Sequence, residues 1–110
     1  MILKFQRSYG VSLPPIGRWK LEVWFCPRGE RIPWHRHEHM SAQITFLAGR
    51  MVFHKLGKSI GLRLRNTFKT FLIRENEPHA ADVTGWFGVF AVIERWSDTP
   101  TSASIDFVHT

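Results

Sequence analysis

The sequence has little cysteine, few acidic residues and no long apolar segment, and each shortage excludes a class of protein. One cysteine, Cys26, stands among its 110 residues, so no disulfide can form within the chain. Nothing therefore indicates an oxidising compartment. No apolar run approaches the roughly 20 residues that a membrane-spanning helix needs, and residues 1–10 become charged too soon for a secretory signal. We expect a cytoplasmic protein that does not associate with membranes.

Core-forming residues, in contrast, are plentiful. Hydrophobic residues make up 44% of the chain and aromatic residues 14%, including five tryptophans and nine phenylalanines. This composition is typical of a globular protein rather than a disordered one. The length suffices for one hydrophobic core but not for two. We therefore expect a single domain over residues 1–110.

The shortage of acidic residues leaves the chain basic. Fifteen lysines and arginines stand against nine aspartates and glutamates, which gives a net charge of +6. Basic residues are densest in residues 54–69, which contain Lys55, Lys58, Arg63, Arg65 and Lys69. A solvated strand face explains this segment most simply. Binding of a nucleic acid through the same segment is a weaker alternative, because clustered basic residues attract phosphates.

Alternating apolar and polar residues predict strands almost everywhere, and no segment keeps a helical period. The expected strands cover residues 20–26, 41–49, 50–56, 59–65, 69–74, 86–96 and 103–109. Turn-forming residues separate them at 48–50, 56–58, 65–66, 75–78 and 84–85. Residues 12–17 form an extended connector, and residues 97–104 form a polar loop. Such closely spaced strands predict an all-β protein, a small antiparallel β-barrel or jelly roll.

Three histidines alternate with charged residues in the segment PWHRHEHMSAQ, residues 33–43. In an extended strand residues i, i+2 and i+4 share one face, so His35, His37 and His39 would project to the same side. Such an arrangement can hold a metal ion, face solvent as a cluster without an ion, or line a partner surface.

The surroundings of these histidines resemble the cupin superfamily. Gly29 precedes His35 by six positions, His37 follows, and Gln43 and Gly49 come next, close to the first cupin motif. The second motif ends in P-x-G-x-x-H, whose histidine matches His79 of "EPH", residues 77–79, while Arg74 stands in place of its proline. Asn76 stands where the family has glycine, and asparagine enters the left-handed conformation at low cost. The resemblance covers about residues 20–95 and implies a small cupin barrel.

The resemblance also implies a metal site. The family's ligand positions correspond to His35, His37 and His79, with Gln43 nearest to the position of a glutamate or glutamine ligand. Imidazole suits several divalent ions, and the sequence does not distinguish Fe, Mn, Ni and Zn. Because the spacer before Gln43 is one residue longer than in the family, an alternative ligand pair, His37 and His39, stays open: a slip of one residue reverses the face of a side chain.

Small-molecule binding or chemistry at that metal is the function that the resemblance implies, and oxygenase or isomerase activity suits an open metal site. The alternative is a non-enzymatic ligand-binding regulator, or an accessory protein such as phages encode. Arg31, Arg36 and Arg50 suggest a basic rim for an anionic ligand, with Arg36 alternating away from the histidines. Cupins commonly form homodimers, so we expect one here.

Other conspicuous residues have simpler interpretations. Trp34 is a candidate for a pocket wall, although core filling explains it as well. Cys26 is interpreted as a small buried hydrophobic residue. His54 and His109 receive no functional role, and no catalytic residue is assigned.

Overall fold

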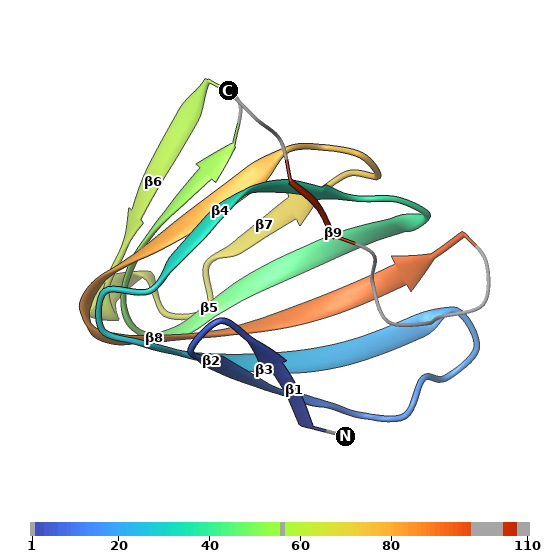
Figure 1. Ribbon diagram of the computed structural model, residues 1–110, viewed down its shortest axis with the longest axis horizontal. Coiled ribbons are helices and arrows are strands. Elements are labelled where there is room, and N and C mark those ends of the chain that lie inside the picture. Colours follow the sequence, from blue (N-terminus) through green and yellow to red (C-terminus); the bar gives the residue numbers. More distant parts are fainter. Residues whose placement is uncertain (1, 56, 98–104, 108–110) are drawn as a thin grey trace.

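The computed structural model describes residues 2–55, 57–97 and 105–107, the last three by their backbone alone. Strands form nearly all of the regular structure, which confirms the all-β prediction (Figure 1). They are β1 (Ile2–Phe5), β2 (Ser8–Ser12), β3 (Trp19–Pro27), β4 (Arg31–His37), β5 (Met40–Lys55), β6 (Lys58–Leu62), β7 (Thr70–Ile73), β8 (His79–Trp96) and β9 (Ile105–Phe107). A short 3₁₀ helix, η1 (Leu64–Asn66), follows β6.

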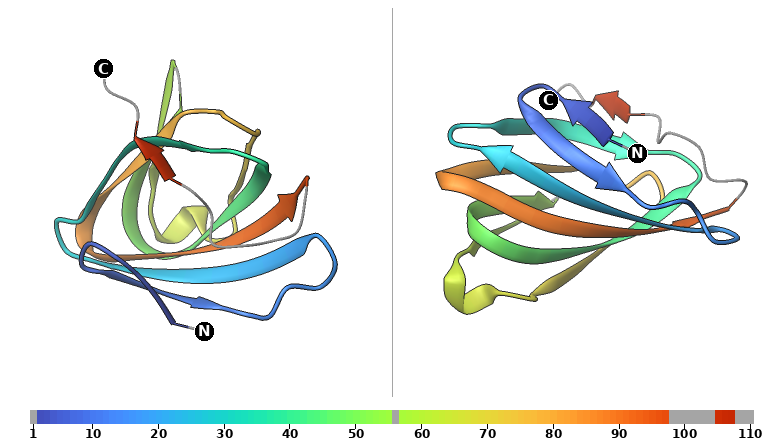
Figure 2. Two further views of the ribbon diagram at one scale, coloured as in Figure 1. Left: turned by 45° about the vertical axis from the view of Figure 1, so that its right-hand side comes forward. Right: turned by 90° about the horizontal axis from the view of Figure 1, so that it is seen from below.

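Two long strands, β5 and β8, join two walls that face each other (Figure 2). In the first wall the end of β8 pairs with β3, which continues to β2 and β1, while the start of β5 pairs with β7. In the second wall the start of β8 pairs with β4, and the end of β5 pairs with β6. All of these pairings are antiparallel, and together the walls surround an interior space.

Two glycines allow the long strands to bend between the walls. Gly49 of β5 stands opposite Gly88 of β8, next to irregularities in the ladder. A Cβ atom on Gly49 would overlap the carbonyl oxygen of Phe87, and one on Gly88 would lie 2.5 Å from Cγ of Met51. The turns predicted at residues 48–50 and 84–85 are therefore wrong, because each strand continues through a bend.

The N-terminal residues form a hairpin that the sequence patterns did not reveal. β1 and β2 extend the first wall beyond β3. Glu30, buried before β4, fastens this hairpin: its Oε2 accepts hydrogen bonds from the Arg7 backbone at 2.9 Å and the Ser8 hydroxyl at 2.7 Å. The hairpin adds two strands to this sheet, in a segment for which no strand was predicted.

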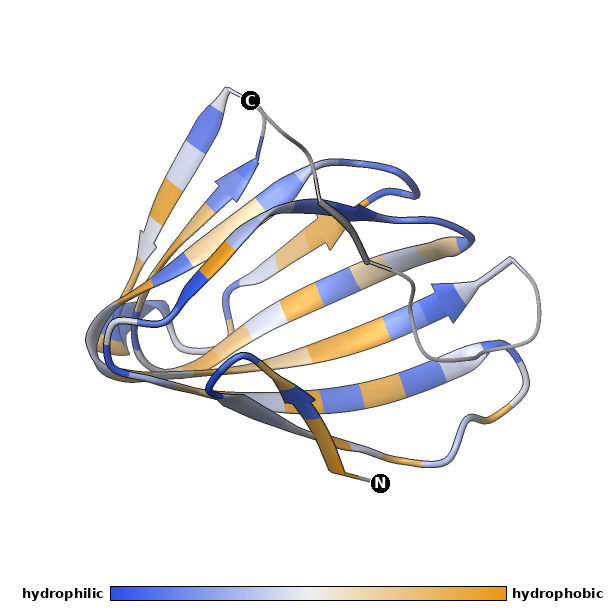
Figure 3. Cartoon of the chain, viewed as in Figure 1, coloured by the Kyte–Doolittle hydropathy of each residue, from blue (hydrophilic) through white to orange (hydrophobic). Residues whose placement is uncertain are grey.

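The alternation of β3 runs opposite to the usual rule of apolar inside and polar outside (Figure 3). Lys20 and Glu22 point inward and are each 6% exposed. Phe25, on the opposite face of the same strand, is 50% exposed. The core proper lies on β5, β6, β7, β8 and the end of β3, where Phe46 is fully buried and Cys26, as predicted, is a buried hydrophobic residue.

In the described part of the chain, no helix has the length and apolar character needed to cross a membrane. The strand predicted at 103–109 is described only at Ile105–Phe107, where β9 pairs with β4. The rest of that strand, His109, and all of the predicted loop except Ser97 lie outside the described residues.

Candidate metal centre

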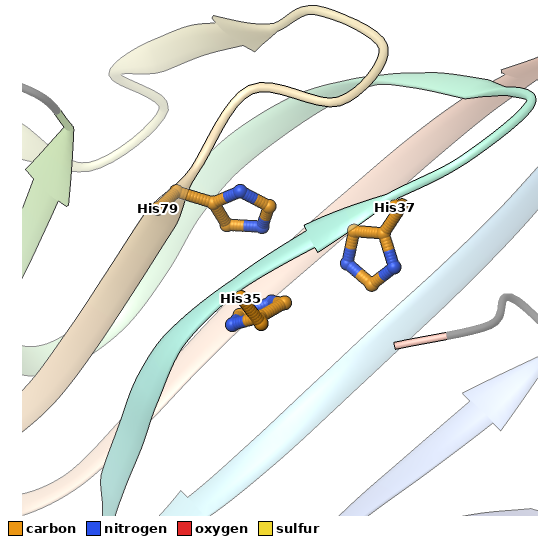
Figure 4. A group of neighbouring side chains, drawn as sticks. All are labelled: His35, His37 and His79. Carbon is orange, nitrogen blue, oxygen red and sulfur yellow. The ribbon is translucent and has the colours of Figure 1, made fainter. Parts of the chain in front are cut away.

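Strand register brings three histidines from two distant segments together (Figure 4). His35 of β4 stands directly opposite His79, the first residue of β8. His37 follows two residues along β4 and shares the inward face. The three residues each offer a ring nitrogen, and these nitrogens all lie within 4.8 Å of one another. We call this group the histidine cluster.

Backbone carbonyls fix the orientation of two of the rings. Nδ1 of His35 lies 2.7 Å from the carbonyl oxygen of Pro33, and Nδ1 of His79 lies 2.9 Å from that of Glu77. Because a carbonyl can only accept, each Nδ1 carries the proton and donates it. The other ring nitrogen, Nε2, then keeps a free lone pair, which is the form of histidine that binds metals.

Burial keeps these two rings neutral. It lowers the pKa of His35 from 6.5 to about 4 and that of His79 from 6.5 to about 3. Charge on the neighbouring histidines adds to the lowering for both, while the backbone hydrogen bonds oppose it. A neutral imidazole needs to lose no proton before it coordinates an ion.

Neighbouring residues hold the cluster in place. The ring of Phe53 lies 6.2 Å from that of His79 and stacks on Phe71 at 5.2 Å. Asn76 has a φ of 62°, the left-handed conformation predicted for it, and its backbone N–H donates to the carbonyl of His37 at 2.9 Å. The turn before β8 is thereby tied to β4, beside the cluster.

His39 does not join the cluster, which decides between the two pairs left open by the sequence. It lies in the turn between β4 and β5 with a φ of 61°, and its side chain is 67% exposed. Its backbone N–H donates to Oε1 of Glu75 at 3.1 Å. The alternative pair of His37 and His39 is therefore wrong, because the turn breaks the extended alternation after His37.

Gln43 also lies away from the cluster, contrary to our expectation. Its side chain is exposed on the outer face of β5, between Leu72 and Ile93 on the adjacent strands. Ala42 and Ile44 occupy the inward positions instead and are buried. The extra residue in the spacer after His37 is the physical reason, because it shifts the strand by one position and reverses the face.

No protein-family model matches the sequence, and no curated protein does either. Solved structures do match the architecture. KdgF from a Halomonas species has a TM-score of 0.77 at 11% identity, with 89% of each chain covered. The Cnp3 cupin domain of Schizosaccharomyces pombe has a TM-score of 0.73 at 12% identity, over 88% of this chain and 69% of that one. The chain has the cupin fold.

A polyketide cyclase, RemF from Streptomyces resistomycificus, shares this cupin fold as well, with a TM-score of 0.74 at 17% identity over 96% of this chain and 73% of that chain. Identities this low establish the architecture alone. The single small cupin domain predicted from the sequence is thus confirmed in its fold.

The cupin barrel encloses a cavity of about 330 Å³, and the histidine cluster lies in its lining. Most of the other lining side chains are apolar, among them Ile44, Phe46, Met51, Phe90 and Val92. A small, mainly apolar cavity with a few convergent polar groups is typical of a site for a small molecule.

Several residues singled out in the sequence lie elsewhere. Arg31, Arg36 and Arg50 are not part of the cavity lining. Arg36 is exposed, as its alternation with the histidines predicted. Trp34 does not line the cavity either; its ring lies 6.2 Å from that of His54 on the outer face.

A second group of polar side chains lines the cavity and escaped the sequence analysis. Lys20 and Glu22 of β3 and Glu94 of β8 are buried together on the first wall. We call this group the Lys–Glu cluster. The signal was present, because Lys20 and Glu22 alternate with apolar residues, but the usual rule assigns the charged positions of such a strand to solvent.

Proposed function

We propose that this chain binds one divalent metal ion through His35, His37 and His79, and that a small molecule binds at that ion within the cavity. The closeness of the three ring nitrogens is the observation that supports this most directly. The two carbonyl hydrogen bonds add to it, because they leave Nε2 of His35 and His79 with a free lone pair.

The donor set fits such an ion. Three neutral imidazoles add no negative charge, and the described residues place no carboxylate beside them. An ion held in this way keeps its full positive charge and has open positions, so it would act as a Lewis acid toward a bound ligand. Fe, Mn, Ni and Zn all accept imidazole ligands. The protein contributes the orientation of the rings and a mainly apolar cavity.

We infer small-molecule chemistry in that space, as an oxygenase or an isomerase, in preference to simple ligand binding. The mainly apolar lining of the cavity supports this choice, because apolar surroundings strengthen electrostatic effects on a reacting molecule. A non-enzymatic, ligand-binding regulator or accessory protein is the alternative. Turnover that is lost in His79→Ala would favour the enzyme, whereas ligand binding without turnover would favour the regulator.

Metal analysis of protein purified without a histidine tag tests the site itself. We expect bound metal, or a rise in melting temperature on addition of Fe, Mn, Ni or Zn, and loss of both in His79→Ala. His39→Ala is the matched control, because His39 lies in the exposed turn. If the wild-type protein holds no metal and none of the four ions raises its melting temperature, the proposal is wrong.

We also propose that the chain forms a homodimer through the outer face of the first wall. Tyr9, Val11, Phe25 and Phe87 there are 46–52% exposed, and Tyr9 stands directly opposite Phe25 on adjacent strands. A contiguous exposed apolar face is typical of a protein interface. Sedimentation should show a dimer that Phe25→Glu dissociates, whereas a wild-type monomer at micromolar concentration would contradict the proposal.

Nucleic-acid binding is a second candidate, and one surface feature favours it. Arg50, Arg63 and Arg65 line a shallow depression together with Gly49 and Leu64. Lys55 does not contribute, because it lies 3.4 Å from Oε1 of Glu77. Binding here predicts salt-sensitive retention on an oligonucleotide column that Arg63→Ala with Arg65→Ala abolishes and His35→Ala preserves. Retention that these arginine changes leave intact would exclude this surface.

A further inference from the structure

The Lys–Glu cluster consists of side chains from two adjacent strands that bond to one another. Nζ of Lys20 lies 3.2 Å from Oε2 of Glu22, and the indole N–H of Trp24 donates to Oε1 of Glu22 at 2.9 Å. The indole N–H of Trp96 donates to Oε1 of Glu94 at 3.1 Å. Glu22 and Glu94 are also joined by a side-chain hydrogen bond.

Burial of these ionisable side chains in the barrel wall is energetically unfavourable. Lys20, Glu22 and Glu94 are 6%, 6% and 2% exposed, and buried charges often stabilise a protein less than apolar residues of the same volume. The three residues also line the ligand-sized cavity together with the histidine cluster. Titratable groups that are both buried and turned toward a cavity are candidates for a functional role.

Glu94 holds a proton at neutral pH. Burial, then the negative charge of Glu22 and the hydrogen bond to it, raise its pKa from 4.5 to about 8 against the opposing effects of Lys20 and Trp96. On the other side of Glu94, strand β5 presents Ala42, which has no charge. Lys4, Phe5 and Ser8 of the N-terminal hairpin complete this part of the lining.

We propose that Glu94 is the proton-exchanging residue of the cavity and that Glu22 and Lys20 position it. The inference rests on the proposed function, because it assumes that a small molecule enters the cavity between the two clusters. It narrows that function to reactions in which a proton moves within the ligand, such as an isomerisation, rather than reactions that consume O₂.

The proton transfer balances without a further reagent. In one direction the O–H bond of Glu94 breaks, the proton bonds to a ligand atom that supplies the electron pair, and Glu94 becomes a carboxylate beside Lys20. In the other direction a ligand C–H or O–H bond breaks, its electron pair stays on the ligand, and Glu94 regains a proton. The two steps at different ligand atoms give an isomer. The ligand class is a compact molecule with an apolar body and an exchangeable proton.

Labelling with N,N′-diisopropylcarbodiimide tests the protonated acid directly. A carboxylic acid adds its O–H across one C=N bond of this small apolar reagent, whereas a carboxylate does not add without a proton. We expect peptide mapping of the wild-type protein to find the label on Glu94 at neutral pH, with labelling lost well above the pKa of about 8. Glu38 and Glu75, whose side chains are exposed, serve as internal controls for the reagent.

Indole NMR signals provide a second measurement that needs no reagent. Trp24 and Trp96 donate to the two carboxyl groups, so their indole N–H resonances should shift together as Glu94 titrates. Glu94→Gln preserves size and hydrogen bonding and should abolish both the shift and the label. Absence of label on Glu94, or indole signals that do not move near its pKa, would overturn the proposal.

These experiments test the role of Glu94 independently of metal binding by the histidine cluster. Neither measurement uses a metal, and both can be made on the wild-type protein. Glu94→Gln should bind metal as the wild type does, because Glu94 does not belong to the histidine cluster. A protein that labels at Glu94 but binds no metal would refute the metal centre alone.

Discussion

Two groups of buried polar side chains line one cavity from opposite walls. The histidine cluster lies on β4 and the start of β8, and the Lys–Glu cluster lies on β3 and the end of β8. Burial acts on both by disfavouring charge, so it lowers the pKa of His35 and His79 and raises that of Glu94. The same physical cause leaves lone pairs on one wall and a proton on the other.

The clusters differ in where their hydrogen-bond partners come from. His35 and His79 each donate to a carbonyl two residues earlier in their own segment. Glu22 and Glu94 depend on side chains, including one another. Loss of one histidine therefore leaves the other with its partner, whereas loss of one member of the Lys–Glu cluster removes an interaction from another buried member. The predictions below test this difference.

Lys20→Met should have the largest effect on stability. It leaves the carboxylate of Glu22 buried without its cation, and breaking a buried ion pair in this way costs about 3–5 kcal/mol. The free energy of unfolding in urea measures the loss. Lys58→Met, on the exposed start of β6, is the control and should change stability by less than about 0.5 kcal/mol. Equal effects of the two substitutions would mean that the cluster is not stabilised as a unit.

His37→Ala should separate metal binding from folding. Removal of one of three ligands should weaken metal binding by more than about 100-fold, since loss of even a supporting hydrogen-bond partner costs 10–100-fold. Because His37 is only half buried, the metal-free protein should lose no more than about 1 kcal/mol. Calorimetric titration and urea unfolding measure the two quantities. If the metal-free His37→Ala protein is unfolded, the histidine cluster is as important for stability as the Lys–Glu cluster, and the expected difference between them is wrong.

Stability of the metal-free protein should depend on pH in opposite senses for the two clusters. Glu94 loses its proton near pH 4.5 in the unfolded chain but keeps it to about pH 8 in the folded protein. Its contribution to the free energy of unfolding therefore falls as the pH rises through this interval. Unfolded histidines gain protons near 6.5, whereas folded His35 and His79 stay neutral to about 4 and 3. The contribution of these two histidines to the free energy of unfolding therefore falls as the pH drops below 6.5.

Urea unfolding over a pH series resolves these contributions. Glu94→Gln should remove the decline toward alkaline pH and leave the decline toward acid unchanged. A decline toward alkaline pH that persists in Glu94→Gln would assign it to another group.

Gln43→Ala should have the smallest effect. Because Gln43 is exposed on the outer face, its loss should change metal affinity by less than about twofold. Calorimetric titration beside the wild type measures the change. A larger loss would return Gln43 to the ligand set and contradict the register of β5.

The sequence predicted the fold class and the three histidines because both depend on local patterns. Alternation identified most strands, and the spacing of His35 and His37 placed them on one face. Gln43 was misplaced because a single extra residue in a turn reverses a whole strand, and no local signal marks the insertion. The continuous paths of β5 and β8 were missed because Gly49 and Gly85 were interpreted as turn residues.

The Lys–Glu cluster was missed for a different reason. Alternation in β3 shows that Lys20 and Glu22 share a face, but it does not show which face is inside. Glu94 becomes their neighbour only through the pairing of β3 with β8, in which Lys20 stands opposite Glu94. Such a cluster depends on tertiary pairing between residues more than 70 positions apart, since residue 94 follows residue 20.

The position of β1 has a consequence for how molecules exchange with the interior. Leu3, Lys4 and Phe5 form part of the cavity lining, yet β1 is an edge strand whose one partner among the described strands is β2. Detaching it breaks one ladder of four residue pairs and leaves β3, β4, β5 and β8 paired as they were. Local opening of this segment therefore disturbs few pairings, and its amide hydrogens should exchange ahead of those in the long strands.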